Sequence, residues 1–381
     1  MEPIMRVTAT GLVHDSRKTA RHQRSTAFTD IAITSDGTVL VTFRAGSEHD
    51  SLDGHILLYA GNGLDGVWNL IYDGYEQGIW EDGTPGEVKT FSIVETRPGL
   101  LTATGLWVDR SDPGLPFVNQ RNQGILPMRI YHTTSTDGGR TWSPRRLMDV
   151  HPHLGASPVT EAIISLPNGV LAQPYETWKE FHDDGPPDQG AYLRLSRDGG
   201  KMWPEYATMA KHPSGEKYYW DVRLAKHPET GRLVGTYWTH DPTLATDVDI
   251  HISWGSPDGM TWTEPVGTGV SGQHCMPIPL GGDRVLFVYP DRRTINGIGA
   301  SLSDDFGETW DAAPQLTVYH SAEGIESGAH GKRTQREIWD DMMAWRFGHP
   351  RGVLLPNGEV LVVFYAGDGQ YLDIHWARIA V

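Results

Sequence analysis

The sequence predicts an all-β fold, a closed ring of six β-sheet blades with four antiparallel strands each, and three observations support it. A pattern of the form Ser-x-Asp-x-Gly-x-Thr-Trp recurs at residues 135–142, 196–203 (with Met202 in place of Thr) and 303–310. Apolar segments that run into Gly-containing turns recur six times. The 44 Gly, 25 Pro and 14 Trp suit many short strands. Repeats at intervals of roughly fifty to sixty residues favour one array over several domains, so we expect 1–381 to form a single domain.

The recurring pattern predicts a hairpin turn. Its Asp would accept hydrogen bonds from turn amides, its Gly would take a positive φ, and its Trp would pack between neighbouring sheets. Shortened copies occur at 256–262 and 65–68. We therefore interpret Trp142, Trp203 and Trp310 as structural wedges rather than catalytic residues.

The six repeat units begin in the same way. Each opens with a strand that ends in a turn and continues with a second strand whose uninterrupted β-forming residues indicate burial on both faces. The opening segments are 29–37, 91–99, 161–169, 221–231, 274–282 and 350–358, and the second strands are 38–43, 100–104, 170–174, 232–237, 284–289 and 359–364.

The last unit lacks a fourth strand, because the chain ends shortly after its third, 371–380. Residues 6–13 precede the first unit and have the composition of a strand. We expect this N-terminal strand to complete the sixth blade and to close the ring, which would remove an exposed sheet edge.

Three long segments interrupt the repeat, at 109–123, 181–190 and 321–346, the last with a possible helix at 334–345. Long loops in a compact ring are often functional walls or lids. Solvated decoration is the other interpretation of each segment, and the sequence does not separate the two.

Charge and cysteine content narrow the classes of partner. The formal net charge is −16, which argues against nucleic acid or an anionic membrane as partner. Cys275 is the only cysteine, so an intramolecular disulfide is impossible and a Cys-based metal site is disfavoured. The first residues lack the features of a signal peptide, so we expect a cytoplasmic location, or secretion if a signal has been trimmed.

The Asp-containing turns, placed at the ends of the repeated strand units, resemble the Asp boxes of the sialidase superfamily, also called BNR-repeat proteins, over nearly the whole chain. The resemblance implies a six-bladed propeller whose active site lies on the axis, at the N-terminal ends of the innermost strands. It also implies a glycoside hydrolase. Sialidases use an Arg triad for the substrate carboxylate, a Tyr nucleophile paired with a Glu, and an Asp acid/base.

Counting back from each strand turn gives the residues that would face this axis. They are strongly polar, which is costly in a purely structural core and favours a functional site over a water-filled channel. The axial positions are Thr29, Asp30, Lys89, Thr90, Thr160, Glu161, Asp221, Arg223, Gln273, His274, His349 and Arg351.

The sequence departs from the sialidase pattern at the centre of the site. Thr29-Asp30-Ile31 stands where sialidases have Arg-Ile-Pro, and His349 aligns with the Tyr nucleophile. By the same resemblance, Asp221 falls near the Glu that partners this Tyr, and Asp50 or Asp53 falls near the acid/base Asp.

Glycoside hydrolysis needs an acid and either a nucleophile or a base. We predict Asp221, Glu161, Asp50 and His349 as catalytic candidates, although each carboxylate could instead pair with a nearby Arg. A planar guanidinium matches a substrate carboxylate, so an exo-acting hydrolase of a terminal, acidic sugar is the first hypothesis. The predicted substrate-binding residues are Arg44, His49, Asp30, Arg223, His274, Arg292 and Arg351.

Two other functions stay open. A lyase acting on uronate-containing polysaccharides would neutralise the carboxylate with Arg or Lys and abstract a proton with a residue such as His349 or His274. A propeller that binds carbohydrate without catalysis is the third hypothesis. The His residues show no metal-ligand spacing, so we predict neither a metal nor a cofactor. Oligomeric state is not predicted.

Overall fold

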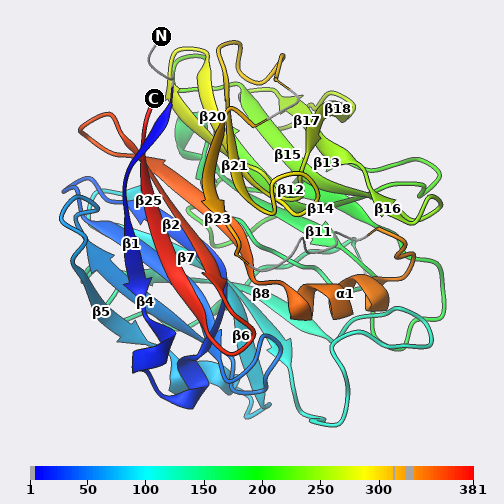
Figure 1. Cartoon of the computed structure of the whole chain (residues 1–381). Coiled ribbons are helices and arrows are strands. Elements are labelled where there is room, and N and C mark those ends of the chain that lie inside the picture. The colour runs from blue at the N-terminus through cyan, green and yellow to red at the C-terminus, as the bar shows by residue number, and fades with distance from the viewer. Residues whose placement is uncertain (1–4, 154, 312–313, 323–329) are drawn as a thin grey trace.

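The computed structural model describes residues 5–153, 155–311, 314–322 and 330–381, and it confirms the six-bladed propeller. All the paired strands within its six sheets are antiparallel (Figure 1). The first three blades, each written from the innermost strand outward, are β2 (Ser25–Ile33), β3 (Val39–Gly46), β4 (His55–Gly61) and β5 (Trp68–Asp73); β6 (Gly86–Arg97), β7 (Leu100–Asp109), β8 (Met128–Ser135) and β9 (Arg146–Leu147); and β10 (Ile164–Ser165), β11 (Leu171–Thr177), β12 (Gly190–Ser196) and β13 (Glu205–Ala210).

The other three blades repeat this order. They are β14 (Tyr218–Lys226), β15 (Leu233–Asp241), β17 (Asp249–Gly255) and β18 (Val266–Ser271), with the short β16 (Thr246–Asp247) added to β15; β19 (Met276–Gly281), β20 (Arg284–Asp291), β21 (Gly297–Ser303) and β22 (Leu316–His320); and β23 (Phe347–Leu354), β24 (Val360–Gly367), β25 (Leu372–Ala380) and β1 (Arg6–His14). Short 3-10 turns lie at Ser16–Lys18, Arg21–Gln23, Tyr75–Gly78 and Pro167–Gly169.

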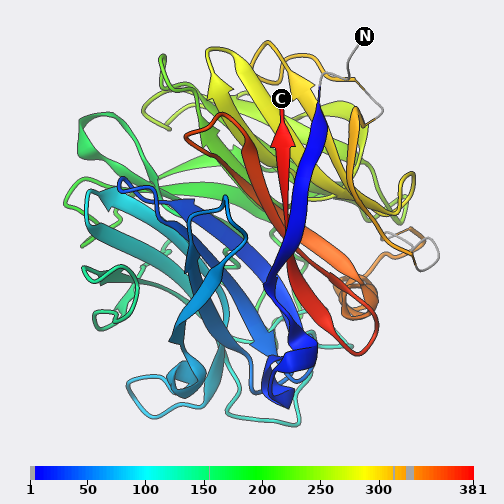
Figure 2. The same cartoon turned by 60° about the vertical axis from the view of Figure 1, so that its left-hand side comes forward.

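The N-terminal strand closes the ring as the sequence predicts. Strand β1 pairs antiparallel with β25, from Arg6 opposite Ala380 to His14 opposite Ile374. The two strands lie side by side in both cartoon views (Figures 1 and 2). The sixth blade therefore combines the first strand of the chain with the last three, and β25 is no longer an edge.

The repeated Ser-x-Asp turns have the hydrogen bonds that their sequence predicts. Asp137 Oδ1 accepts from the backbone N–H groups of Arg140 and Thr141, both at 3.0 Å, and Ser135 Oγ accepts from the backbone of Gly139 at 2.9 Å. Trp142 then packs between blades, with its ring 5.0 Å from Phe91 in its own blade and 6.4 Å from Tyr72 in the first. These contacts agree with a structural role for the turn.

The apolar core lies between neighbouring blades, because each second strand is buried on both faces. Val41 and Phe43 of the first blade, for example, share a buried cluster with Val363 and Tyr365 of the sixth.

The inner strand of the third blade is shorter than predicted. Only Ile164–Ser165 pairs with β11, and Glu161 precedes the strand.

Helix α1 (Gln335–Ala344) confirms the helix predicted in the last long segment; residues 323–329 of that segment lie outside the described residues. A capping box fixes its start, because Thr334 Oγ1 accepts from the backbone of Glu337 and the Glu337 carboxylate accepts from the backbone of Thr334. Its buried residues Ile338, Trp339 and Met342 fall on one face.

That buried face of α1 packs on the other two long segments. Phe117 of the 109–123 segment and Phe181 of the 181–190 segment belong to the same buried cluster as Trp339. The structure therefore makes walls of these segments rather than solvated decoration.

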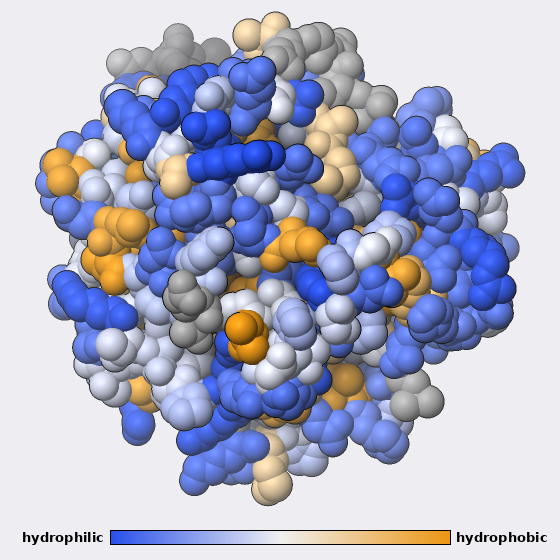
Figure 3. Space-filling view, turned by 90° about the horizontal axis from the view of Figure 1, so that it is seen from below, coloured by the Kyte–Doolittle hydropathy of each residue, from blue (hydrophilic) through white to orange (hydrophobic). Residues whose placement is uncertain are grey.

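Among the described residues, no helix combines the length and hydropathy needed to cross a bilayer. The face seen in Figure 3 is mostly hydrophilic, with scattered apolar residues.

Candidate active site

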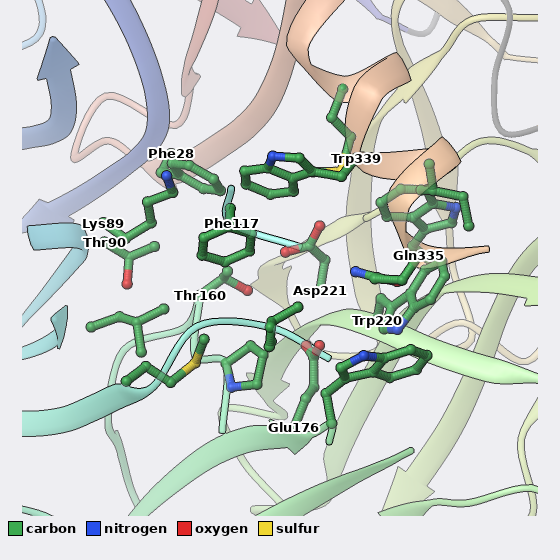
Figure 4. A pocket seen from close by; sticks show the side chains of 18 of the residues that line it. Phe28, Lys89, Thr90, Phe117, Thr160, Glu176, Trp220, Asp221, Gln335 and Trp339 are labelled. Atoms are coloured by element: carbon green, nitrogen blue, oxygen red, sulfur yellow. The ribbon is translucent and has the colours of Figure 1, made fainter. Parts of the chain in front are cut away.

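A pocket lies at the axis of the ring, between the inner strands and helix α1 (Figure 4). The apolar side chains that line it are Phe28, Leu106, Phe117, Ile125, Met128, Pro158, Trp178, Trp220, Trp238, Ile338, Trp339 and Met342, and the polar ones are Lys89, Thr90, Thr160, Glu176, Thr177, Asp221 and Gln335. A concave, largely apolar site with a few converging polar groups is typical of ligand pockets. Of the residues predicted as catalytic, Asp221 is the one in this lining.

Three inner strands carry a bulge around their third or fourth residue. Phe28, Asp221 and His349 have φ values of +53°, +48° and +47°, and the pairing of β2, β14 and β23 shifts register around each of them. None of the three is a glycine, so this left-handed backbone costs free energy. The bulges place Phe28 and Asp221 in the pocket lining, and His349 packs against Phe28 with their rings 4.7 Å apart.

Two carboxyl groups belong to the pocket, Asp221 and Glu176, and Figure 4 shows both facing its interior. Glu176 lies near the end of β11 and is 5% exposed, and its Oε1 accepts a hydrogen bond from the backbone of Val222 at 3.0 Å. Burial, reinforced by the charge of Asp221, raises the pKa of Glu176 to about 8. Glu176 therefore holds its proton at neutral pH, beside a second carboxyl group.

Asp221 faces two nitrogen groups at distances longer than a hydrogen bond. Its Oδ1 lies 3.8 Å from the Arg223 guanidinium and its Oδ2 lies 3.7 Å from His274 Nδ1. The imidazoles of His274 and His349 stack with centroids 4.4 Å apart. Burial and the neighbouring cationic groups lower the pKa of both His residues well below the ordinary value, so both rings are neutral.

A second charged cluster, made of Arg44, Asp50, Glu87, Lys89 and Arg110, lies beside the pocket between the first two blades. Lys89 Nζ lies 2.5 Å from Asp50 and 3.1 Å from Glu87, and Arg44 lies 2.8 Å from Glu87. Arg110 contacts both carboxylates. Although burial opposes ionisation, these cations hold the pKa of Glu87 below its ordinary value. Asp50 and Arg44 are thus occupied by internal pairs.

Glu161 and Asp30 form a third buried group with Arg351. The guanidinium lies 2.6 Å from Glu161 and 3.5 Å from Asp30. Burial raises the pKa of Asp30 to about 6, although Arg351 opposes the shift. This placement gives Glu161 a cationic partner outside the pocket lining, which is the structural alternative that the sequence left open.

The remaining predicted binding residues also have internal partners. Arg292 donates to the Gln273 side chain at 3.1 Å and lies 3.9 Å from the ring centroid of Trp345. His49 stacks on Phe28 with centroids 5.9 Å apart, and burial with Arg44 lowers its pKa to about 3. Neither residue lines the pocket.

The sequence analysis missed Glu176 and Gln335. Glu176 is the penultimate residue of β11, the second strand of its blade, and in an antiparallel pair that end lies beside the start of the inner strand. The same reasoning that selected the starts of inner strands would therefore have selected Glu176. Gln335 is the first residue of α1, and no pattern in the sequence indicates which face of that helix meets the pocket.

Comparisons with known proteins agree on the fold. No family model and no curated protein matches the sequence. A protein of unknown function from Dyadobacter fermentans superposes with a TM-score of 0.72 at 18% identity, over 100% of both chains. The Trypanosoma rangeli sialidase in complex with the inhibitor DANA has a TM-score of 0.62 at 13% identity, over 98% of this chain and 58% of that one. This chain has a divergent sialidase-like fold.

The likeness extends to a propeller with another named activity. The Penicillium chrysogenum alpha-L-arabinanase complexed with arabinobiose has a TM-score of 0.61 at 13% identity, over 97% of this chain and 98% of that one. The structural neighbours of this sialidase-like propeller thus include glycosidases of more than one kind.

Proposed function

We propose that the protein is an exo-acting glycoside hydrolase that removes a terminal sugar, with Glu176 as the general acid and Asp221 as its carboxylate partner. The observation that carries the proposal is the pair of carboxyl groups in one pocket, one of which holds its proton at neutral pH. Two carboxyl groups with different protonation are the usual requirement of this reaction. The glycosidases among the structural neighbours support the same class.

In this mechanism Glu176 donates its proton to the glycosidic oxygen as the bond to the anomeric carbon breaks. Asp221 either attacks that carbon or removes a proton from an attacking water. The buried, apolar lining keeps the proton on Glu176 until the leaving oxygen takes it. Glu176, now ionised, can then accept a proton from the water that completes a retaining reaction.

The pocket offers both stacking surfaces and polar contacts for a sugar. Trp220 and Trp178 line it, and apolar sugar faces commonly stack on such rings. Gln335 lines the pocket and extends from α1 toward Asp221 in Figure 4. We assign its side-chain amide to a contact with a sugar hydroxyl. Phe117 and Trp339 line the pocket and stack with ring centroids 4.2 Å apart, and we call this pair the roof of the pocket. The roof supports removal of a terminal sugar over cleavage within a sugar chain.

The lining favours a neutral sugar over the acidic sugar that the sequence predicts. Lys89 is the only basic side chain among the described residues of the lining, and it is already paired with Asp50 and Glu87. Arg44 and Arg351, two of the candidates for binding a substrate carboxylate, pair with internal carboxylates instead. The arabinanase among the structural neighbours gives one neutral-sugar precedent on this fold.

A panel of aryl glycosides tests both the reaction and the sugar. It would include arabinosides, neutral hexosides, uronides and sialosides, with the parent protein, Glu176→Gln and Asp221→Asn run together. We expect each variant to lower turnover of the accepted substrate by about 10²–10⁴. Glu205→Gln, in an exposed ion pair with Arg197, is the matched control and should keep full activity.

Product analysis separates the alternatives. The anomer released first, followed by NMR, reports whether Asp221 attacks carbon directly or activates water. Full activity in Glu176→Gln would reject the acid assignment. An unsaturated product from a uronate polymer would identify a lyase, and sugar binding without turnover would identify a binding propeller.

A further inference from the structure

The imidazole of His274 has a defined tautomer. It is fully buried, and its Nε2 accepts a hydrogen bond of 3.0 Å from the backbone N–H of His349. An amide N–H can only donate, so Nε2 carries no proton. Because the ring is neutral, the proton lies on Nδ1. His274 therefore presents a single N–H donor on the side that faces Asp221.

This donor has no hydrogen-bond partner. His274 Nδ1 is buried and unpaired, and the nearest carboxylate oxygen, Asp221 Oδ2, lies 3.7 Å away. That distance is too long for a direct hydrogen bond. A buried donor left unpaired costs free energy and calls for an explanation. A small movement of the carboxylate during the reaction would satisfy the donor.

Backbone strain falls on both sides of the same contact. Asp221 and His349 take φ values of +48° and +47° in bulges of two different blades. One bulge presents the carboxylate, and the other presents the N–H that fixes the His274 tautomer. Strain and an unpaired donor that meet at one contact indicate a function there.

A bound divalent cation is the competing explanation, because Asp221, His274 and His349 offer ligand atoms within 4.8 Å of one another. The tautomers do not favour it. His274 Nδ1 carries a proton, and His349 Nδ1 faces the Arg223 guanidinium at 3.4 Å, which can only donate. A cation would need both lone pairs and would lie beside the positive charge of Arg223.

We propose that His274 is a positioning residue that holds the Asp221 carboxylate in its reacting orientation through the Nδ1–H, with the tautomer fixed by the backbone of His349. This inference rests on the proposed glycosidase function. His274 does not line the pocket and acts on the substrate only through Asp221.

Two substitutions separate the two nitrogens of the ring. In His274→Asn the amide nitrogen replaces Nδ1 and keeps the donor toward Asp221. In His274→Gln the longer side chain reaches the Nε2 position, where its carbonyl oxygen keeps an acceptor for the His349 N–H, and it places no donor at the Nδ1 position that faces Asp221. We expect His274→Gln to lower kcat by about 10–100-fold with KM within about twofold, and His274→Asn to recover most of this loss.

Equal loss in both variants, with a lower unfolding midpoint, would reduce His274 to a structural role and overturn the proposal. Stimulation of the parent protein by added Zn²⁺, abolished in both variants, would replace it with a metal site. A further measurement does not depend on turnover: ¹⁵N NMR of the imidazole should report the Nδ1–H tautomer, and a proton on Nε2 would overturn the inference. Absence of any glycosidase activity in the parent, with this tautomer present, would instead reject the proposed function.

Discussion

Two buried charged groups border the pocket, one through Lys89 and the other through Asp221, and their contacts differ. In the cluster of Arg44, Asp50, Glu87, Lys89 and Arg110, each side chain lies within 3.1 Å of at least one opposite charge. Around Asp221 the corresponding distances are 3.7 and 3.8 Å. Saturated pairs leave no group free to react, whereas loose contacts leave a carboxylate whose environment can tighten. The first group supports the fold, and the second is suited to chemistry.

We expect the largest loss of stability from a substitution in the first of these groups, the cluster around Glu87. Glu87 is fully buried and contacts three cations, so Glu87→Gln would leave Lys89 and Arg110 to Asp50 and would remove the carboxylate that pairs with Arg44. Removing one partner from a buried ionic group typically costs about 3–5 kcal/mol. We expect a loss of that size in the free energy of unfolding, measured with denaturant. Glu205→Gln should cost less than about 0.5 kcal/mol; similar losses in the two variants would contradict the distinction between the clusters.

In the second group, the protonation of Glu176 should make both stability and activity depend on pH. Its pKa is about 8 in the folded protein and 4.5 in the ordinary carboxyl group, so the fold favours the protonated form. The resulting stability is fully present below about pH 4.5 and is lost as pH rises through about 8. Activity should fall over the upper part of the same range, because the general acid loses its proton. In Glu176→Gln the stability should vary less between these pH values, and an unchanged profile would remove the assigned pKa.

A substitution at the strained bulge tests whether stability is given up for function. Glycine accepts a φ of +48° without the penalty that a side chain meets. We expect Asp221→Gly to unfold at the same free energy as the parent, or up to about 1 kcal/mol higher, while losing turnover. A loss above about 2 kcal/mol in denaturant unfolding would show that Asp221 stabilises the fold, as Glu87 does.

The smallest effect on turnover concerns the roof of the pocket. Thr334→Ala removes one half of the capping box of α1, which typically costs about 0.5–2 kcal/mol. We expect faster hydrogen exchange within α1 and a raised KM, with little change in kcat, because α1 carries Gln335 and Trp339. Thr334→Ser keeps the hydroxyl and should behave as the parent. Unchanged exchange in Thr334→Ala would show that packing alone holds the helix.

Most of the fold could be predicted from the sequence because its signals are local and repeated. The Ser-x-Asp turns, the six strand openings and the closing strand each depend on residues a few positions apart. The capped helix at Gln335–Ala344 was predicted for the same reason. The shortness of the inner strand β10 was not predicted, because its extent depends on how it pairs with β11 and not on its own sequence.

The site could be predicted only in part, because its chemistry depends on contacts between blades. Asp221 was found from its place near a strand start, and Glu176 was missed because it lies near the end of a second strand, β11. The partners of Asp50 and Arg44 come from another blade, so no local pattern reveals that Lys89 and Arg110 pair with Asp50 or that Glu87 pairs with Arg44. The left-handed backbone at Phe28 and His349 could not be predicted either, because the residues around them do not have the pattern of a turn.

The pairing of β1 with β25 has a mechanical consequence. Arg6 lies opposite Ala380, so opposing forces applied at these two residues would act across the strands, along the hydrogen bonds that join them. Such a load breaks the ladder one pair at a time, starting from Arg6, instead of shearing all of its bonds together. When force is applied at Arg6 and Ala380, we expect the ring to open at low force between β1 and β25 while the other five blades keep their sheets.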